Sequence, residues 1–111
     1  MENDVKSKQL YNIEAEQAIL GKIISNNEYF DSIEEILNDE NYFYDVSNRE
    51  IFKYIRNTIR NMGIRADSIT LQNFFDSNSS IVAVGGSAYL STLLNSAIGL
   101  IDVVSYAKII K

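Results

Sequence analysis

The chain has 111 residues with neither cysteine nor histidine, and its ten basic and fifteen acidic residues give a formal net charge of -5. This length fits a single domain with one modest core. The missing residue types exclude disulfides, thiolate nucleophiles, cysteine-ligated zinc and histidine general bases, and the acidic balance disfavours nucleic acid as the first partner.

Apolar residues recur mainly three and four positions apart and proline is absent, so the sequence predicts an all-α fold, a compact bundle of five to six short helices. Residues 1–11 lack this periodicity and are expected to form a flexible N-terminal arm ahead of a helical head domain over residues 12–111. The first helix should begin after Asn12 as N-cap and end near residues 26–27, and the second should span about residues 28–37.

The third helix carries the clearest predicted start and end. Ser47 and Glu50 have the spacing of a capping box, in which the two side chains satisfy each other's free backbone N–H groups. Gly63 can adopt the left-handed conformation that closes a helix. We therefore expect this helix to run between these two signals.

The remaining helices are expected after shorter signals. The fourth should open at Asp67 or Ser68, and residues 77–80 should form a loop. The fifth should follow Gly86, and the last should begin at about Asp102.

A glycine pair, Gly85 and Gly86, stands before a helical pattern, as glycines do in phosphate-binding loops. A P-loop also needs a lysine for the phosphates, and no lysine lies between Lys53 and Lys108. A tight turn explains the pair. With no nucleophile and base that can be named, we predict no catalytic, cofactor-binding or metal-ligating residue in this chain.

Four cations of the third predicted helix, at i, i+4, i+7 and i+11, fall on one narrow stripe: Arg49, Lys53, Arg56 and Arg60. Residues 26–48 hold seven acidic residues, Glu34 and Glu35 among them, and no basic one. The two groups are expected to pair within the chain, across a subunit contact or with an outside partner, or the stripe is simply solvated.

The aromatic run at Tyr42, Phe43 and Tyr44 has two interpretations. Its rings can plug the gap between the second and third helices, or they can form an exposed patch that binds a partner. Tyr42 and Tyr44 are therefore candidate interface residues, together with the four cations and the two carboxylates named above.

Five collinear segments resemble the N-terminal domain of DnaB-type replicative DNA helicases, and the match to which they belong covers about residues 12–111. They read NIEAEQAILG (12–21), YFYDVSNREIF (42–52), DSITL (67–71), VGGSAYLSTL (84–93) and YAKII (106–110). Two positions depart from the family pattern, because Val46 stands where proline is common and Asn48 where histidine is common.

The resemblance implies a small helical head that, in the parent protein, precedes a helical hairpin, a linker and a RecA-like ATPase, all expected to lie outside this chain. ATP and magnesium would bind that ATPase. Heads of this family pair within a hexameric ring and help to dock DnaG-type primase, and helicase loaders are further partners. DNA would be bound only through the parent protein.

These observations favour a noncatalytic assembly and protein-docking domain of a replicative helicase. The alternative is direct binding of single-stranded DNA by the four cations, with Tyr54 as a stacking platform. No apolar run approaches the ~20 residues that span a bilayer, and the polar start MENDVKSKQL is unlike a signal peptide. We therefore expect a cytoplasmic protein with no membrane partner.

Overall fold

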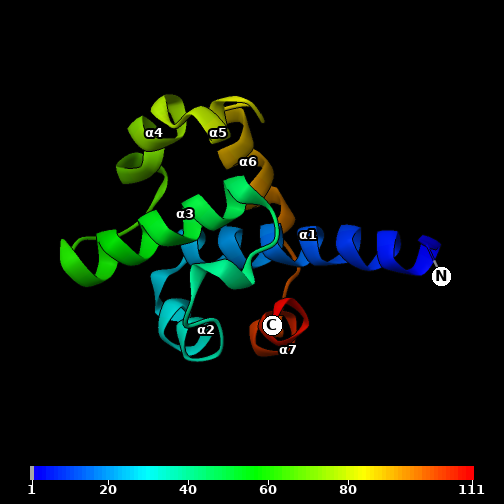
Figure 1. The fold of residues 1–111 in the computed structure, drawn as a ribbon. Coiled ribbons are helices and arrows are strands. Elements are labelled where there is room, and N and C mark those ends of the chain that lie inside the picture. Colours follow the sequence, from blue (N-terminus) through cyan, green and yellow to red (C-terminus); the bar gives the residue numbers. More distant parts are fainter. Residues whose placement is uncertain (1) are drawn as a thin grey trace.

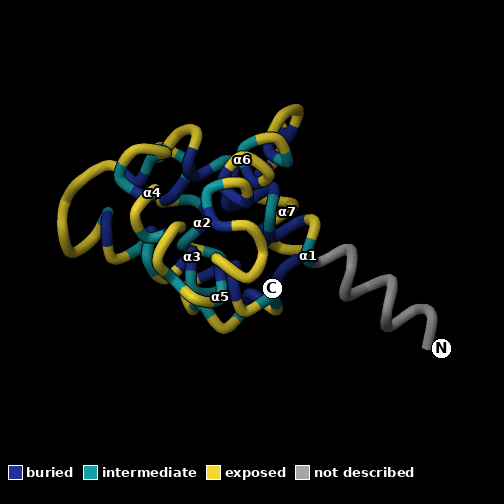
Figure 2. The backbone as a smooth tube through the Cα atoms, turned by 90° about the horizontal axis from the view of Figure 1, so that it is seen from above, coloured by how far each residue is buried: buried dark blue, intermediate teal, exposed yellow. Residues whose placement is uncertain are grey.

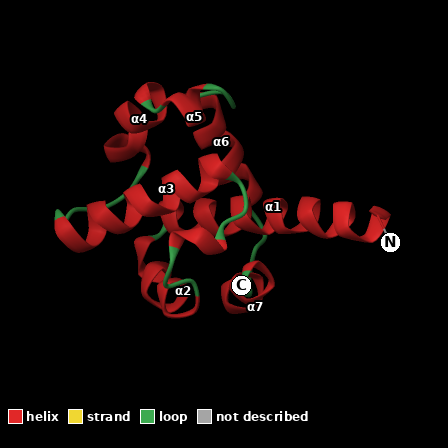
Figure 3. Ribbon diagram, in the orientation of Figure 1, coloured by secondary structure: helices red, strands yellow, loops and turns green. Residues whose placement is uncertain are grey.

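The computed structural model describes the backbone of residues 2–111 and the side chains of residues 13–111. Every regular element in that part of the chain is helical, which confirms the predicted all-α class (Figure 3). The α-helices are α1 (Glu2–Ser25), α2 (Phe30–Ile36), α3 (Val46–Arg56), α4 (Ser68–Ser77), α5 (Ser79–Val82), α6 (Ser87–Ser96) and α7 (Val103–Ile110). Two 3-10 helices, η1 (Asn27–Tyr29) and η2 (Glu40–Tyr42), and a π-helical turn, η3 (Asn57–Asn61), complete the set. None of the described helices is long and apolar enough to cross a membrane.

The helix α1 is the centre of the arrangement. It packs against α6, α7 and α3, while α2 packs on α7 and α4 packs on α6. In Figure 1, α4, α5 and α6 lie above α1, and α2 and α7 lie below it. Helices from both halves of the sequence thus share one core.

That core is built from apolar side chains at helical spacing, and Figure 2 marks the buried segments in dark blue. Phe52 of α3 joins several layers, because its ring lies 4.7 Å from that of Phe43 and 6.1 Å from that of Phe30, centroid to centroid. The largest side chains that are fully buried are Phe30, Phe43, Phe52, Phe75, Ile19, Leu20, Ile23, Ile33, Leu37, Ile51, Ile55 and Leu71.

Several predicted boundaries are confirmed. The Asp67 carboxylate accepts hydrogen bonds from the backbone N–H groups of Ile69 and Thr70, so Asp67 caps α4. Asp102 caps α7 through the backbone N–H of Ser105. Gly63 has φ +67° beyond the end of η3, and Gly86 has φ +58° before α6, so both turn the chain as predicted.

The predicted start of the third helix is wrong. Asp45 is the N-cap of α3, and its carboxylate accepts from the backbone N–H of Asn48. Ser47 lies inside the helix, where its hydroxyl donates to the carbonyl oxygen of Ser80 at 3.0 Å. Asp45 and Ser47 are both residue types that can cap a helix. Asp45 is the cap here, and the Ser47 hydroxyl instead contacts Ser80 of α5.

Two further expectations differ from the structure. The predicted loop at residues 77–80 contains the start of α5, because Asn78 accepts from the backbone N–H groups of Ser80 and Ile81 and so nucleates a short helix. The helix α1 passes through Asn12, the predicted N-cap, and residues 2–12 contain no glycine or proline to end it. The side chains of the predicted arm, residues 1–11, lie outside the described residues, and the arm stays a prediction.

Candidate protein interface

The cationic stripe runs along α3 into η3, and its last two arginines form ion pairs within the chain. Arg56 forms an ion pair with Glu40 of η2. Arg60 reaches α2, where its Nη2 lies 2.6 Å from carboxylate oxygens of both Asp31 and Glu34. Of the alternatives that the sequence left open, internal pairing is therefore the one that the structure shows for these two arginines.

The pairing is reflected in the electrostatics of the partners. The hydrogen bond from Arg56 is the main cause that holds the pKa of Glu40 below its ordinary value. The hydrogen bonds that Arg60 donates to Glu34 and Asp31 raise the pKa of Arg60. The Arg60 guanidinium also lies 4.8 Å from the ring centroid of Phe30, so its planar group covers a core aromatic as well as pairing with acids.

The other two cations of the stripe behave differently. Arg49 donates from Nε to the carbonyl oxygen of Phe43 at 3.2 Å and from Nη2 to that of Tyr44 at 3.3 Å, so it braces the segment before α3. Lys53 is exposed, and no carboxylate among the described side chains forms an ion pair with it. Lys53 is thus the stripe residue whose charge faces outward.

The two candidate carboxylates on α2, Glu34 and Glu35, lie in different surroundings. Glu34 is half-buried and binds Arg60, as described above. Glu35 is exposed, and it lines a groove between α2 and α7. The structure therefore does not place the two neighbouring glutamates in one site.

The three aromatics before α3 divide between the two predicted roles. Phe43 is fully buried and plugs the gap between helices. Tyr42 is half-buried beneath the Lys111 ammonium, which lies 5.6 Å from its ring centroid. Tyr44 is 55 % exposed, and its neighbour Val46 is 54 % exposed. Only the third position of the run presents a largely open aromatic ring.

A buried polar network, which the residue pattern did not predict, supports the exposed pair Tyr44 and Val46. Glu16 of α1 is fully buried, and its carboxylate accepts from the backbone N–H of Tyr44 at 2.6 Å, that of Asp45 at 3.3 Å and the Asn48 side-chain amide at 3.0 Å. Asn48 in turn accepts from the hydroxyl of Tyr89 on α6. Three helices are thereby joined at the N-terminus of α3.

Burial raises the pKa of Glu16 above its ordinary value, although the three hydrogen bonds act in the opposite direction. Burial also raises the pKa of Tyr89, whose hydroxyl donates to Asn48, to about 12. The only sequence signal for this network is a glutamate that falls on the apolar side of a predicted helix, between Ala15 and the buried isoleucines.

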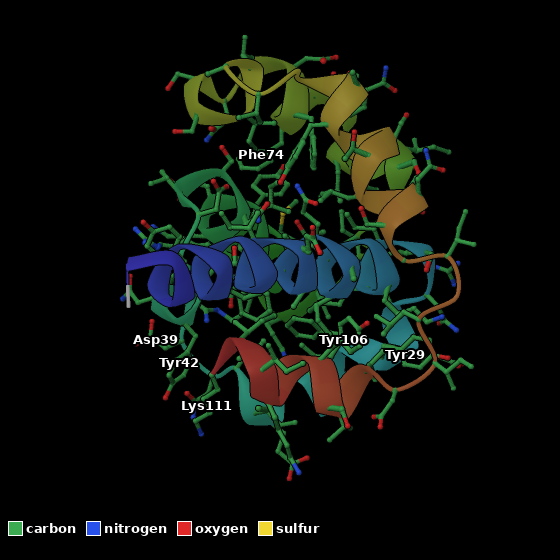
Figure 4. All side chains as sticks on the ribbon, turned by 90° about the vertical axis from the view of Figure 1, so that its right-hand side faces the viewer. Tyr29, Asp39, Tyr42, Phe74, Tyr106 and Lys111 are labelled. Atoms are coloured by element: carbon green, nitrogen blue, oxygen red, sulfur yellow. The ribbon has the colours of Figure 1, made fainter. Side chains whose placement is uncertain are left out.

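The exposed side of α3 continues into a small groove toward α4, lined by Glu50, Lys53, Tyr54, Asn57 and Phe74. The rings of Tyr54 and Phe74 stack with centroids 3.9 Å apart and 12° between their planes. Figure 4 shows Phe74 reaching down from the upper helices toward α3. One face of the Tyr54 ring is therefore already occupied.

We expect charge reversal at Arg56 and Arg60 together to lower the stability of the domain slightly and to leave its association with partners unchanged. Both arginines pair within the chain, and partly exposed ion pairs contribute roughly 0–1 kcal/mol each. Urea unfolding measures the first effect and sedimentation the second. Weakened association of the double variant without any loss of stability would contradict the internal role.

Residues 8–111 match the model of the DnaB-like helicase N-terminal domain family. The chain is 35 % identical to the replicative DNA helicase DnaB of Haemophilus influenzae over 114 residues, covering 98 % of the chain and 24 % of the relative. It is 34 % identical to that of Rickettsia conorii over 99 residues, covering 89 % of the chain and 20 % of the relative.

A third relative, the replicative DNA helicase DnaB of Pasteurella multocida, is 35 % identical over 101 residues, which are 91 % of the chain and 21 % of the relative. The chain thus spans about a fifth to a quarter of the length of these relatives. The resemblance first seen in five sequence segments is confirmed, and the chain belongs to the family of DnaB-like helicase N-terminal domains.

Proposed function

We propose that this chain is the noncatalytic assembly and protein-docking domain of a replicative DNA helicase. Its relatives are named replicative DNA helicase DnaB, and the chain matches a fifth to a quarter of their length. ATP and magnesium would then be used by another part of the protein, and DNA would be held there too. The role of this domain would be to contact other polypeptides.

The proposal rests on two exposed side chains, Tyr44 and Val46, beside backbone that Glu16 holds by hydrogen bonds. We define the α3 N-terminal face as Tyr44, Val46, Glu50 and Lys53, of which the last three follow one another at i, i+4 and i+7 on α3. Tyr44 and Val46 are more than half exposed, while the backbone beneath them is fixed by Glu16. Rigid, exposed aromatic and apolar side chains with a charge beside them are typical anchors of protein interfaces.

The partners proposed for this domain are a second head within a hexamer and a DnaG-type primase, with a helicase loader as a further candidate. The α3 N-terminal face suits such contacts because little of it would have to be ordered on binding. Lys53 supplies an exposed positive charge at its rim that forms no ion pair with the side chains of residues 13–111, which favours a partner with acidic side chains there.

We expect the double variant Tyr44→Ser/Val46→Ser to bind the C-terminal domain of a DnaG-type primase at least about tenfold more weakly, because the pair forms the apolar centre of the proposed contact. Light scattering of the mixed proteins and titration calorimetry measure the loss. The matched control is Ile69→Ser, which removes a side chain that is 85 % exposed on α4, away from this face.

Equal affinities for the wild type and the double variant would remove this face from the docking surface. The unfolding temperature of each variant must stay close to that of the wild type, since the substituted side chains are exposed. A loss of binding shared by Ile69→Ser would indicate a general loss of structure rather than a loss of contact.

Direct binding of single-stranded DNA receives less support from the geometry. Arg56 and Arg60 are neutralised by neighbouring carboxylates, and Arg49 is directed at backbone carbonyls. The ring of Tyr54 is covered on one face by Phe74. A DNA-binding surface needs cations that are free to replace counterions along the phosphates. Of the four cations of the stripe, Lys53 is the one that no described side chain pairs with and no backbone carbonyl is shown to bind.

A further inference from the structure

A second surface, on the opposite side of the domain from α4 and α5, has the features of a binding groove. It runs between α2 and α7, which pack side by side. Its lining comes from both helices and comprises Ser32, Glu35, Ile36, Val104, Lys108 and Lys111. Because 104, 108 and 111 follow at i, i+4 and i+7, all three lie on one side of α7 and its C-cap, with Val104 at the floor of the groove and Lys108 and Lys111 on its wall.

The floor of this groove is apolar and its two walls differ in charge. Val104 is 37 % exposed and Ile36 is half-buried, so hydrocarbon is accessible between the helices. The α7 wall carries Lys108 and Lys111, while the α2 wall carries Glu35. A domain with a net charge of -5 therefore has a locally basic wall here.

Nothing within the described side chains neutralises that wall by direct pairing. The ion pairs that the described side chains form involve Arg56 and Arg60 and not the two lysines of α7. The Lys111 ammonium lies over the ring of Tyr42, which places it at one end of the groove (Figure 4).

We propose that the α2–α7 groove binds an amphipathic helix of another protein, with apolar side chains on Ile36 and Val104 and carboxylates along the flank that faces Lys108 and Lys111. Two helices side by side leave a furrow that the ridge of a third helix fills. Helix-in-groove recognition of this kind uses apolar anchors at one-turn spacing, with charges that select the partner. The inference rests on the proposed docking function, and it adds a second surface to the α3 N-terminal face.

The experiment uses two synthetic peptides of about 15 residues, a length that can form a helix on binding. Both carry leucines along one face. The acidic peptide has glutamates along one flank of that face, and the basic peptide has lysines at the same positions. Each is titrated into the isotopically labelled 111-residue chain, and amide chemical shifts are followed by nuclear magnetic resonance.

We expect the acidic peptide to bind more tightly than the basic one and to shift amide signals of α2 and α7. In the variant Lys108→Glu/Lys111→Glu the preference should reverse, each change being roughly fivefold to tenfold, because two solvent-exposed ion pairs are exchanged for repulsion. Val104→Ser should weaken both peptides. The control Arg65→Glu, which changes an exposed cation outside both surfaces, should change neither affinity.

Several outcomes would overturn this inference. One is absence of binding, and another is equal affinity of the wild type for the two peptides. Shifts confined to α3 and α4 would place the site elsewhere. Concentration-dependent self-association that Val104→Ser abolishes would instead assign the groove to a second copy of the chain. None of these results would touch the proposed docking role of Tyr44 and Val46, which is measured with other variants and another partner.

Discussion

Replacing Gly21 with alanine is expected to destabilise the domain by about 3 kcal/mol, the upper part of the range for inserting an atom into a packed core. A Cβ at this position would lie 1.8 Å from the carbonyl oxygen of Leu93 and 2.6 Å from its carbonyl carbon. Both atoms belong to the backbone of α6, so they cannot rotate away. The central helix α1 and α6 would have to separate.

The sign of the change in unfolding free energy shows whether α1 and α6 pack closely at Gly21. Without the contact, alanine at a helical glycine stabilises a protein by roughly 0.5–1 kcal/mol through its helix propensity. Denaturant unfolding of Gly21→Ala measures the difference. The comparison variant is Gly63→Ala, where the added Cβ would meet no described atom within 4 Å apart from its chain neighbours, and the left-handed backbone, φ +67°, opposes the change. A stabilised Gly21→Ala protein would contradict the close packing of α1 on α6.

Replacing Glu16 with alanine is the second substitution for which we expect a large effect, a loss of about 3 kcal/mol or more, because each buried polar group left without a partner costs roughly 1–3 kcal/mol. The backbone N–H groups of Tyr44 and Asp45 and the side-chain amide of Asn48 would all lose their acceptor. The control is Glu14→Ala, which changes an exposed glutamate on the same helix. Similar stability of the two variants would exclude the network as a support of α3.

Because the pKa of Glu16 is raised, we also expect Glu16 to make the free energy of unfolding depend on pH. Comparison with Glu16→Gln separates this contribution from those of the other carboxylates. The pKa of Glu16 is raised in the folded state, so the folded protein binds more protons than the unfolded chain between the ordinary value of 4.5 and the folded pKa. The contribution of Glu16 to the free energy of unfolding therefore falls as pH rises through that window. The glutamine variant should lack this component, whereas an identical pH profile would show that Glu16 titrates normally.

Local signals explain how much of this fold was predictable from the sequence. Asp67 and Asp102 cap their helices with their own side chains, and Gly63 and Gly86 turn the chain at positive φ, a conformation that favours glycine. Such features depend on a few neighbouring residues. The start of α3 was mispredicted because Ser47 and Asp45 offer competing caps, and the contact that decides between them comes from Ser80, 33 positions away.

The candidate interface was predictable only as a set of residue types. Helical spacing placed the four cations on one stripe, but the partners of Arg56 and Arg60 lie in η2 and α2, and sequence alone could not choose internal pairing. The Glu16 network was missed because its members come from α1, α3 and α6. The apolar groove between α2 and α7 was missed for the same reason, since each wall alone looks like an ordinary solvated helix face.

A single titration tests the central claim that this domain recognises polypeptides through the α3 N-terminal face. The labelled chain is followed by nuclear magnetic resonance while either the C-terminal domain of a DnaG-type primase or a single-stranded oligonucleotide is added at low salt. We predict that the primase domain shifts the amide signals around Tyr44, Val46 and Lys53, and that the oligonucleotide leaves them unchanged. Shifts at these residues produced by the oligonucleotide and not by the primase domain would contradict the claim and favour a DNA-binding module.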